Sequence, residues 1–175
     1  MLNYFELFAM PVSFELDLQR LSHNYQELQK LTHPDRFAGE SGQQQRLAIQ
    51  KNSQVNDGFQ ILKSPIGRAE HLLALRGIEL ANETQTMQDM GFLMQQMQWR
   101  ELLEESSDSD DPQSVIDELI DEVASTEQAI KSNILLHLEL NTDEANQAVA
   151  EDVRKLKFID KMNTEISEQE EKLFN

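Results

Sequence analysis

Residues 17–37 read DLQRLSHNYQELQKLTHPDRF, and this stretch decides how the first part of the chain folds. Asp17 can cap a helix, because its carboxylate can accept hydrogen bonds from the first free backbone amides. Apolar side chains then recur at helical spacing, at Leu18, Leu21, Tyr25 and Leu28. Pro34 has no amide hydrogen and disfavours the α conformation in the residue before it, so this helix must end near Leu31. We therefore expect residues 32–37 to form a loop.

Helical patterns flank this stretch on both sides. Spacing typical of a helix resumes after Gly42, with one apolar stripe made of Ala48, Val55, Phe59 and Leu62. Ser64 can cap a shorter helix that begins with a proline and has Gly77 just beyond its end. Near the N-terminus, residues 4–8 form a short aromatic segment that could pack across the two longer helices. Residues 1–76 therefore predict a small four-helix unit.

The rest of the chain predicts a second unit made of three longer helices. After a connector at residues 77–85, the first helix should cover about residues 86–105. A turn rich in Ser and Asp precedes the second helix, whose apolar face is marked by Ile116, Leu119, Ile120, Val123, Ile130, Ile134 and Leu138. The last helix should cover about residues 143–174. Close to one of its faces lie Ala145, Val149, Val153, Leu156, Ile159 and Asn163. Short turns between three helices predict an antiparallel bundle over residues 86–175. No stretch sustains a two-residue alternation, so we expect an all-α protein.

Charge is distributed unevenly along the chain. The sequence has 15 Lys and Arg against 32 Asp and Glu residues, a formal net charge of −17. Residues 1–80 hold 8 basic and 9 acidic side chains, whereas residues 81–175 hold 7 basic and 23 acidic ones. The composition therefore changes near Leu80, within the expected connector. Binding to nucleic acid or to an anionic membrane needs a basic surface, so we expect neither as a partner.

Several classes of protein are excluded by what the sequence lacks. Cysteine is absent, which excludes disulfides, thiolate metal sites and a cysteine nucleophile. His23, His71 and His137 lie too far apart for a helical metal site, so we expect no metal and no other cofactor. No apolar run approaches the roughly 18 residues that a membrane span needs, and residues 1–10 carry no basic residue, unlike a secretory signal. We expect a soluble protein of the cytoplasm.

His33, Pro34 and Asp35 form the first feature that packing alone does not require. In a purely structural interpretation, Pro34 stops the helix, His33 lies at the negative end of the helix dipole, and Asp35 bonds to local backbone. In a functional interpretation, the three residues form a recognition loop. No partner nucleophile or carboxylate pair lies at recognisable spacing from His33, so a role in binding fits better than catalysis.

Three segments together resemble the J domain of DnaJ-type co-chaperones. They are YFELF at residues 4–8, HPDRF at 33–37 and VNDGFQIL at 55–62. Other segments resemble the HscB family, the J proteins of bacterial iron–sulfur cluster assembly: RAEHLL at 68–73, FLM at 92–94 and VRKLKFIDK at 153–161. The resemblance spans nearly the whole chain. It implies a J domain at residues 1–76 and a three-helix C-terminal domain at residues 86–175.

This resemblance implies that the first unit binds a chaperone of the HscA/DnaK type and stimulates its ATP hydrolysis. In the family, the His-Pro-Asp loop and the basic face of the preceding helix make that contact. The matching residues in this chain are His33, Pro34, Asp35, Arg36, Arg20 and Lys30. The helix itself supplies only Arg20 and Lys30 as permanent cations, so electrostatic steering toward the chaperone should be weak.

The helix expected at residues 86–105 has more apolar surface than a bundle can bury. At helical spacing, Met90, Leu93, Met94 and Met97 gather on one side, opposite Phe92, Trp99 and Leu103. An edge helix buries one stripe only, and Phe158 similarly lies opposite Val149 on the last helix. Exposed methionine and aromatic side chains form an adaptable protein-binding surface. Alternatively, the first unit or a dimer could bury both stripes.

The HscB resemblance implies that this surface binds the scaffold on which iron–sulfur clusters are built, an IscU-type protein. The matching residues are Leu93, Met94, Met97, Arg100, Glu101 and Phe158. Gln98 stands where the family has an acidic residue, so we expect one polar contact fewer. Met97 stands where leucine is usual, a swap that nearly conserves volume.

We therefore expect an adaptor that presents the scaffold to the chaperone, and not an enzyme. Two alternatives stay open. A general J protein for unfolded clients would usually have a Gly/Phe-rich linker and a cysteine-rich zinc module, which this chain lacks. A metal-dependent helical hydrolase built on His33 and Asp35 would need a second ligand cluster, which the spacing does not offer.

Overall fold

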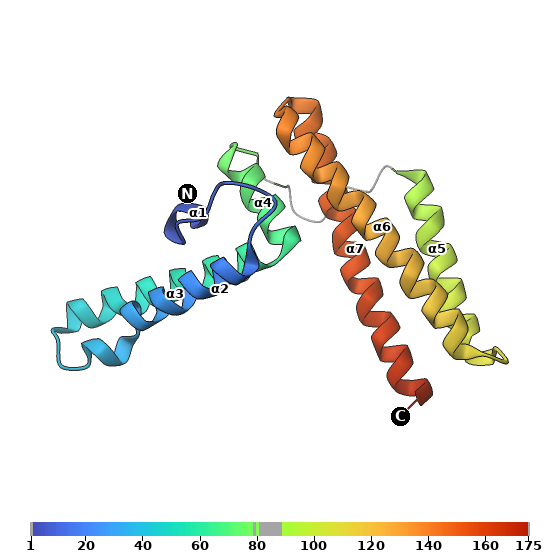
Figure 1. Cartoon of the computed structure of the whole chain (residues 1–175), viewed down its shortest axis with the longest axis horizontal. Helices are drawn as coiled ribbons and strands as arrows, with labels where there is room; N and C mark the ends of the chain where they lie inside the picture. Colours follow the sequence, from blue (N-terminus) through green and yellow to red (C-terminus); the bar gives the residue numbers. More distant parts are fainter. Residues whose placement is uncertain (1, 79, 81–88, 175) are drawn as a thin grey trace. The chain divides into compact units, whose positions relative to one another are not determined.

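The described part of the chain is built of α-helices and short 3-10 turns (Figure 1). The computed structural model describes residues 2–78, 80 and 89–174, and among these it contains no strand. The predicted all-α class is confirmed. The chain divides into two compact units, Met1–Glu79 and Leu80–Asn175. The expected connector at residues 77–85 lies largely outside the described residues, so the limits of the two predicted domains stay a prediction.

The first unit is built around a hairpin of two long helices, as Figure 1 shows. Its elements are α1 (Tyr4–Leu7), α2 (Leu18–Thr32), the 3-10 turn η1 (Pro34–Phe37), α3 (Gly42–Lys63) and α4 (Pro65–Leu75). Asp17 caps α2 as expected, since its Oδ1 accepts hydrogen bonds from the amides of Gln19 and Arg20, both at 3.0 Å. Ser64 caps α4 in the same way, and Gly77 has a φ of 79°, which glycine adopts without strain.

The core of this unit lies between α1, the hairpin and α4. Its fully buried side chains include Phe5, Leu21, Leu62 and Leu73. A Cβ at Gly58 would lie 2.5 Å from the ring of Tyr4, so glycine lets α1 approach α3 closely. Leu18, which the spacing placed on the buried face, is 45 % exposed in the first turn of α2.

The chain between α2 and α3 is more regular than the expected loop. Pro34–Phe37 form one turn of 3-10 helix, in which the amide of Arg36 donates to the carbonyl of His33 at 3.1 Å. A proline is compatible with the first position of such a turn, because its amide would have no partner there. Pro34 therefore ends one helix and starts the next turn.

The second unit is a bundle of α5 (Met90–Glu105), α6 (Pro112–Leu140) and α7 (Asp143–Phe174), with the 3-10 turn η2 (Ser106–Asp108) after α5. Asn141 connects α6 to α7 in the left-handed conformation, with φ 48° and ψ 39°. The predicted apolar face of α6 is buried, with Ile120 partly exposed at its edge. No helix in the described residues is both long enough and apolar enough to cross a membrane.

Two details of this bundle differ from the sequence-based expectation. Asn163 is exposed, and the core positions are Met162 and Ile166, which are 0 % and 2 % exposed. Met162 and Ile166 lie three and seven residues after Ile159, so they continue the buried stripe of the helix. Asn163 is the next residue after Met162 and lies outside that stripe. The first helix begins at Met90, because Asp89 is extended and caps it. Residues 86–88, where the start was expected, lie outside the described residues.

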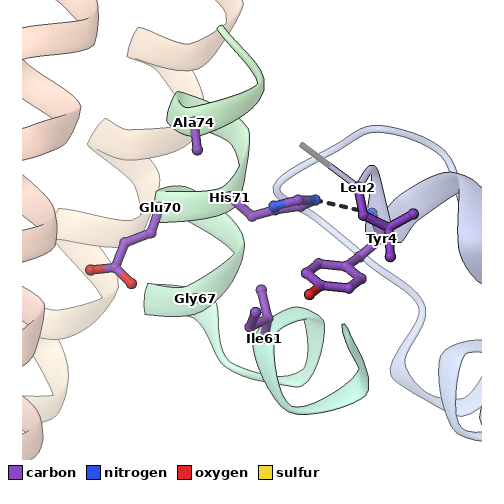
Figure 2. A pocket seen from close by; sticks show the side chains of 7 residues that line it. All are labelled: Leu2, Tyr4, Ile61, Gly67, Glu70, His71 and Ala74. Atoms are coloured by element: carbon purple, nitrogen blue, oxygen red, sulfur yellow. Dashed lines mark hydrogen bonds between the residues drawn. The ribbon is translucent and has the colours of Figure 1, made fainter. Parts of the chain in front are cut away.

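A buried histidine joins α4 to α1 in the first unit (Figure 2). The Nε2 atom of His71 accepts a hydrogen bond from the backbone amide of Tyr4 at 3.1 Å. The imidazole also stacks on the ring of Phe5, with centroids 5.6 Å apart. Burial lowers the pKa of His71, because a charged imidazole would lose its hydration. A neutral Nε2 is also what the bond from Tyr4 requires.

We expect the stability of this unit to decrease when the pH falls from 7.5 to 5.5. The pKa of His71 is lower in the folded chain than its value of about 6.5 in the unfolded chain, so the unfolded chain binds more protons in this interval. The stabilisation is complete above the unfolded pKa and is lost as the pH falls through the folded pKa. A His71→Gln variant should therefore show a smaller fall in melting temperature, by roughly 2–4 °C. His23→Gln, at an exposed position on α2, is the control; equal pH dependence in all three proteins would contradict the prediction.

Candidate partner-binding sites

The first candidate site is the turn that follows α2. His33 ends the helix, and its Nδ1 accepts a hydrogen bond from the amide of Asp35 at 3.3 Å. The carboxylate of Asp35 lies 3.6 Å from the same nitrogen. The two side chains nevertheless remain 54 % and 89 % exposed. The structural and the functional interpretations of this turn are therefore compatible, since one short turn caps itself and presents its side chains to solvent.

The cations expected near this turn do not form one cluster. Arg36 lies beside the turn, where its Nη1 donates to the carbonyl of Lys30 at 2.9 Å. Lys30 pairs with Glu27 at 2.7 Å on the exposed face of α2, and an exposed pair of this kind contributes little. Arg20 lies ten residues before Lys30, which is about 15 Å along a helix, and its Nη2 donates to the carbonyl of Ala9. The structure therefore brings Lys30 and Arg36 to the turn and leaves Arg20 at the far end of α2.

A shallow groove beside the turn was not expected from the sequence. It is lined by Gln26, Gln29, Lys30 and His33. These residues follow one another at intervals of three, one and three, so they share one face of α2. Glutamine carries no charge and no distinctive chemistry, which is why helical spacing from His33 was the only signal that could have identified Gln26 and Gln29.

The second candidate site is the outer face of α5. Met90, Met94 and Met97 are 68 %, 62 % and 72 % exposed, and Leu93 is partly buried. On the opposite side of the helix, Trp99 is 0 % exposed and Phe92 is 6 % exposed. We call the exposed set, with Leu93, the methionine face. The separation of α5 into two apolar faces follows the helical spacing.

Phe158 lies beside this face and is partly buried. Its ring lies nearly perpendicular to that of Phe92, with centroids 5.9 Å apart. The guanidinium of Arg100 lies over the ring of Phe158 at 5.2 Å, and its Nε is 3.7 Å from the carboxylate of Glu165. The structure thus brings Phe158 to Arg100, while Glu101 and Gln98 project as exposed side chains from α5. Glu165, one acidic residue among many, was missed because only the fold brings α7 beside α5.

The described residues hold no group of three or more His, Asp or Glu side chains that could bind a metal ion. His33 and Asp35 therefore have no third ligand within the part of the chain that is described. The hydrolase alternative has no geometric observation in its favour.

Comparisons with known proteins agree with this architecture. A family model described as the HSCB C-terminal oligomerisation domain matches residues 88–167. The "Co-chaperone protein HscB homolog" of Pseudoalteromonas atlantica is 50 % identical over 172 residues, covering 98 % of each chain. That of Shewanella baltica is 48 % identical over 174 residues, covering 99 % of this chain and all of the other.

Two solved structures share the fold. Chaperone HscB from Vibrio cholerae superposes with a TM-score of 0.91 at 41 % identity and covers 98 % of this chain and 100 % of its own. Human co-chaperone HscB superposes with a TM-score of 0.85 at 27 % identity, covering 97 % and 83 %. The all-α fold and these similarities define the class of protein as a co-chaperone. The chain belongs to the HscB family.

We expect the methionine face to be oxidised before the core. Mild peroxide should convert Met90, Met94 and Met97 to sulfoxides severalfold faster than Met10 and Met162, which are 7 % and 0 % exposed. Peptide mass spectrometry of the intact protein after timed exposure measures each rate. Equal rates at Met97 and Met162 would mean that the face is covered in solution.

Proposed function

We propose that this co-chaperone is an adaptor between two proteins. The first unit binds an ATP-dependent chaperone of the HscA/DnaK type, and the second binds an iron–sulfur scaffold of the IscU type. One observation carries the proposal: each compact unit leaves exposed to solvent a set of side chains that the packing of its own core does not use. These features are the side chains of the His-Pro-Asp turn in the first unit and the methionine face in the second.

The His-Pro-Asp turn is suited to recognition. Its backbone is fixed by Pro34 and by the bond from the amide of Asp35 to His33, so little conformational entropy is lost on binding. The same bond occupies Nδ1 of His33, and no nucleophile has been identified beside the imidazole. We infer that His33, Pro34, Asp35 and Arg36 contact the chaperone, together with Lys30 and the more distant Arg20. ATP hydrolysis is then the chemistry of the chaperone, and this chain is not itself an enzyme.

The methionine face is suited to binding a folded protein. Unbranched thioether side chains adapt to an irregular partner surface, and the rigid ring of Phe158 can serve as an anchor beside them. We infer that the scaffold contacts Leu93, Met94, Met97 and Phe158, with Arg100 and Glu101 at the rim. Arg100 is held over the ring of Phe158, so it can offer a charge at a defined place.

The two surfaces explain how one small protein couples two partners. A scaffold held by the second unit has a raised effective concentration at the chaperone held by the first unit. No new contact between scaffold and chaperone is needed for this gain. We expect the protein to act in the cytoplasm, with both partners.

The chaperone contact is tested by replacing His33. A His33→Gln variant should lose most of its stimulation of the steady-state ATPase of an HscA-type chaperone, measured with an IscU-type scaffold present. Its affinity for the scaffold should not change, because the substitution is in the other unit. Gln50→Ala, at an exposed position on α3 outside the proposed contact, is the control and should stimulate normally. Full stimulation by the His33 variant would show that the turn is only a helix stop.

The scaffold contact is tested by a triple variant in which Leu93, Met97 and Phe158 are replaced by alanine. Removal of central apolar contacts should weaken scaffold binding by at least about tenfold, or about 1.4 kcal/mol. Titration calorimetry measures the affinity. A Leu136→Ala, Leu140→Ala variant is the control, because these two leucines are 59 % and 64 % exposed on α6 and outside the proposed surface. An unchanged affinity of the triple variant would contradict the assignment.

A further inference from the structure

A small group of charged side chains in the second unit has no part in either proposed surface. Lys155, on α7, is 17 % exposed and lies between two carboxylates. Its Nζ is 2.8 Å from Oδ2 of Asp89, at the start of α5, and 3.4 Å from Oδ1 of Asp152, one turn earlier on α7. Asp152 is 7 % exposed and also lies 3.9 Å from Nδ1 of His137 on α6. The group therefore takes residues from all three helices of the bundle, although Nδ1 of His137 makes no hydrogen bond to it.

Asp89 is the stronger partner of the two carboxylates. The hydrogen bond with Lys155, followed by that from the amide of Phe92, holds the pKa of Asp89 below its ordinary value. Burial raises the pKa of Asp152, although Lys155 opposes this shift. Burial by itself would lower the pKa of Lys155, but the hydrogen bond with Asp89 and the charges of Asp152 and Asp89 outweigh it, and the pKa is raised. Lys155 therefore stays charged, and its pair with Asp89 is the well-formed one.

The two oxygens of Asp89 have different tasks. Oδ1 caps α5 by accepting the amide hydrogen of Phe92 at 3.0 Å, while Oδ2 binds Lys155. The ammonium group of Lys155 also lies 5.8 Å from the centre of the Phe92 ring. Lys155 thus contacts both the capping residue Asp89 and the ring of Phe92 at the start of α5.

The first turn of α5 is also where the methionine face begins. Met90 and Leu93 belong to this turn, and Phe92 touches Phe158. Farther along α5, Gln95 donates to Glu122 of α6 at 3.2 Å, and Trp99 is buried. These later contacts hold the middle of the helix. The Lys155–Asp89 pair ties the first turn to α7, beside the contact of Phe92 with Phe158.

We propose that Lys155 is a positioning residue for scaffold binding, because its pair with Asp89 fixes the first turn of α5, and with it Leu93 and Met94, relative to Phe158. This inference rests on the proposed function of the methionine face. The side chain of Asp89 is 40 % exposed, and an ion pair that is partly open to solvent adds little net stability, but its geometry can specify how two helices meet. The main effect of removing it is thus a less defined surface.

The test compares scaffold affinity with local order in the full chain. Lys155→Met keeps most of the side-chain volume but loses the charge, and it should weaken binding of an IscU-type scaffold about tenfold. Lys155→Arg keeps the charge and should restore most of the affinity. Lys172→Met, an exposed lysine near the end of the same helix, should bind normally. Hydrogen exchange should become faster at the amides of residues 92–95 in the Lys155→Met protein and stay unchanged along α6.

A second substitution tests the pair itself. Asp89→Asn keeps an oxygen for the cap and removes the charge, so it should weaken binding when made alone and add little to Lys155→Met. Fully additive effects would overturn the inference, and so would faster exchange along all of α6 and α7, which would report general loss of the bundle.

The outcomes also separate this inference from the function on which it rests. Normal affinity in Lys155→Met, with weak binding by the Leu93, Met97 and Phe158 triple variant, would overturn the inference and leave the proposed function standing. Normal affinity in both proteins would overturn both.

Discussion

A helix at the edge of a three-helix bundle can bury only one of its faces, and the second unit depends on how α5 meets this constraint. Trp99, Phe92 and Leu103 fill the side that faces α6 and α7, and the two aromatic rings among them remove a large apolar area from water. Met90, Met94 and Met97 are left on the other side. The apolar stripes of α6 and α7 bury each other, although Leu136 and Leu140 of α6 lie outside that stripe and are exposed.

In the first unit, the main constraint is the end of α2. A helix that must stop leaves backbone groups without partners, and so does the start of the next turn. The amides of Asp35 and Arg36 find acceptors within the turn, at Nδ1 and at the carbonyl of His33. Arg36 covers the carbonyl of Lys30 in the last turn of α2. Because local bonds do this work, no other part of the fold has to cover the turn, and its side chains stay exposed. The structural role of His33 therefore helps to keep its side chain exposed. This role is compatible with a second role in recognition.

The parts of this fold that obey local rules could be predicted from the sequence, and those that depend on distant residues could not. Asp17, Ser64 and Gly77 mark helix ends because each acts on backbone within a few residues. The described start of α5 at Met90 depends on such a distant residue, since the cap by Asp89 is reinforced by Lys155, 66 positions later in the sequence. Asn163 was assigned to the core because helical spacing alone cannot separate adjacent positions near the edge of a stripe. The candidate site shows the same division: spacing revealed the methionine face, but only the fold brings Glu165 to Arg100.

The strong negative charge of the second half of the chain affects which proteins can approach the methionine face. Residues 81–175 hold 23 acidic and 7 basic side chains, a net charge of −16. An apolar patch of this kind would favour association between copies of the chain, but two copies that carry the same charge repel each other as they approach. A partner with complementary charge at its rim meets no such barrier. The net charge of this unit therefore opposes the approach of a second copy, which agrees with the proposal that a different protein occupies the face.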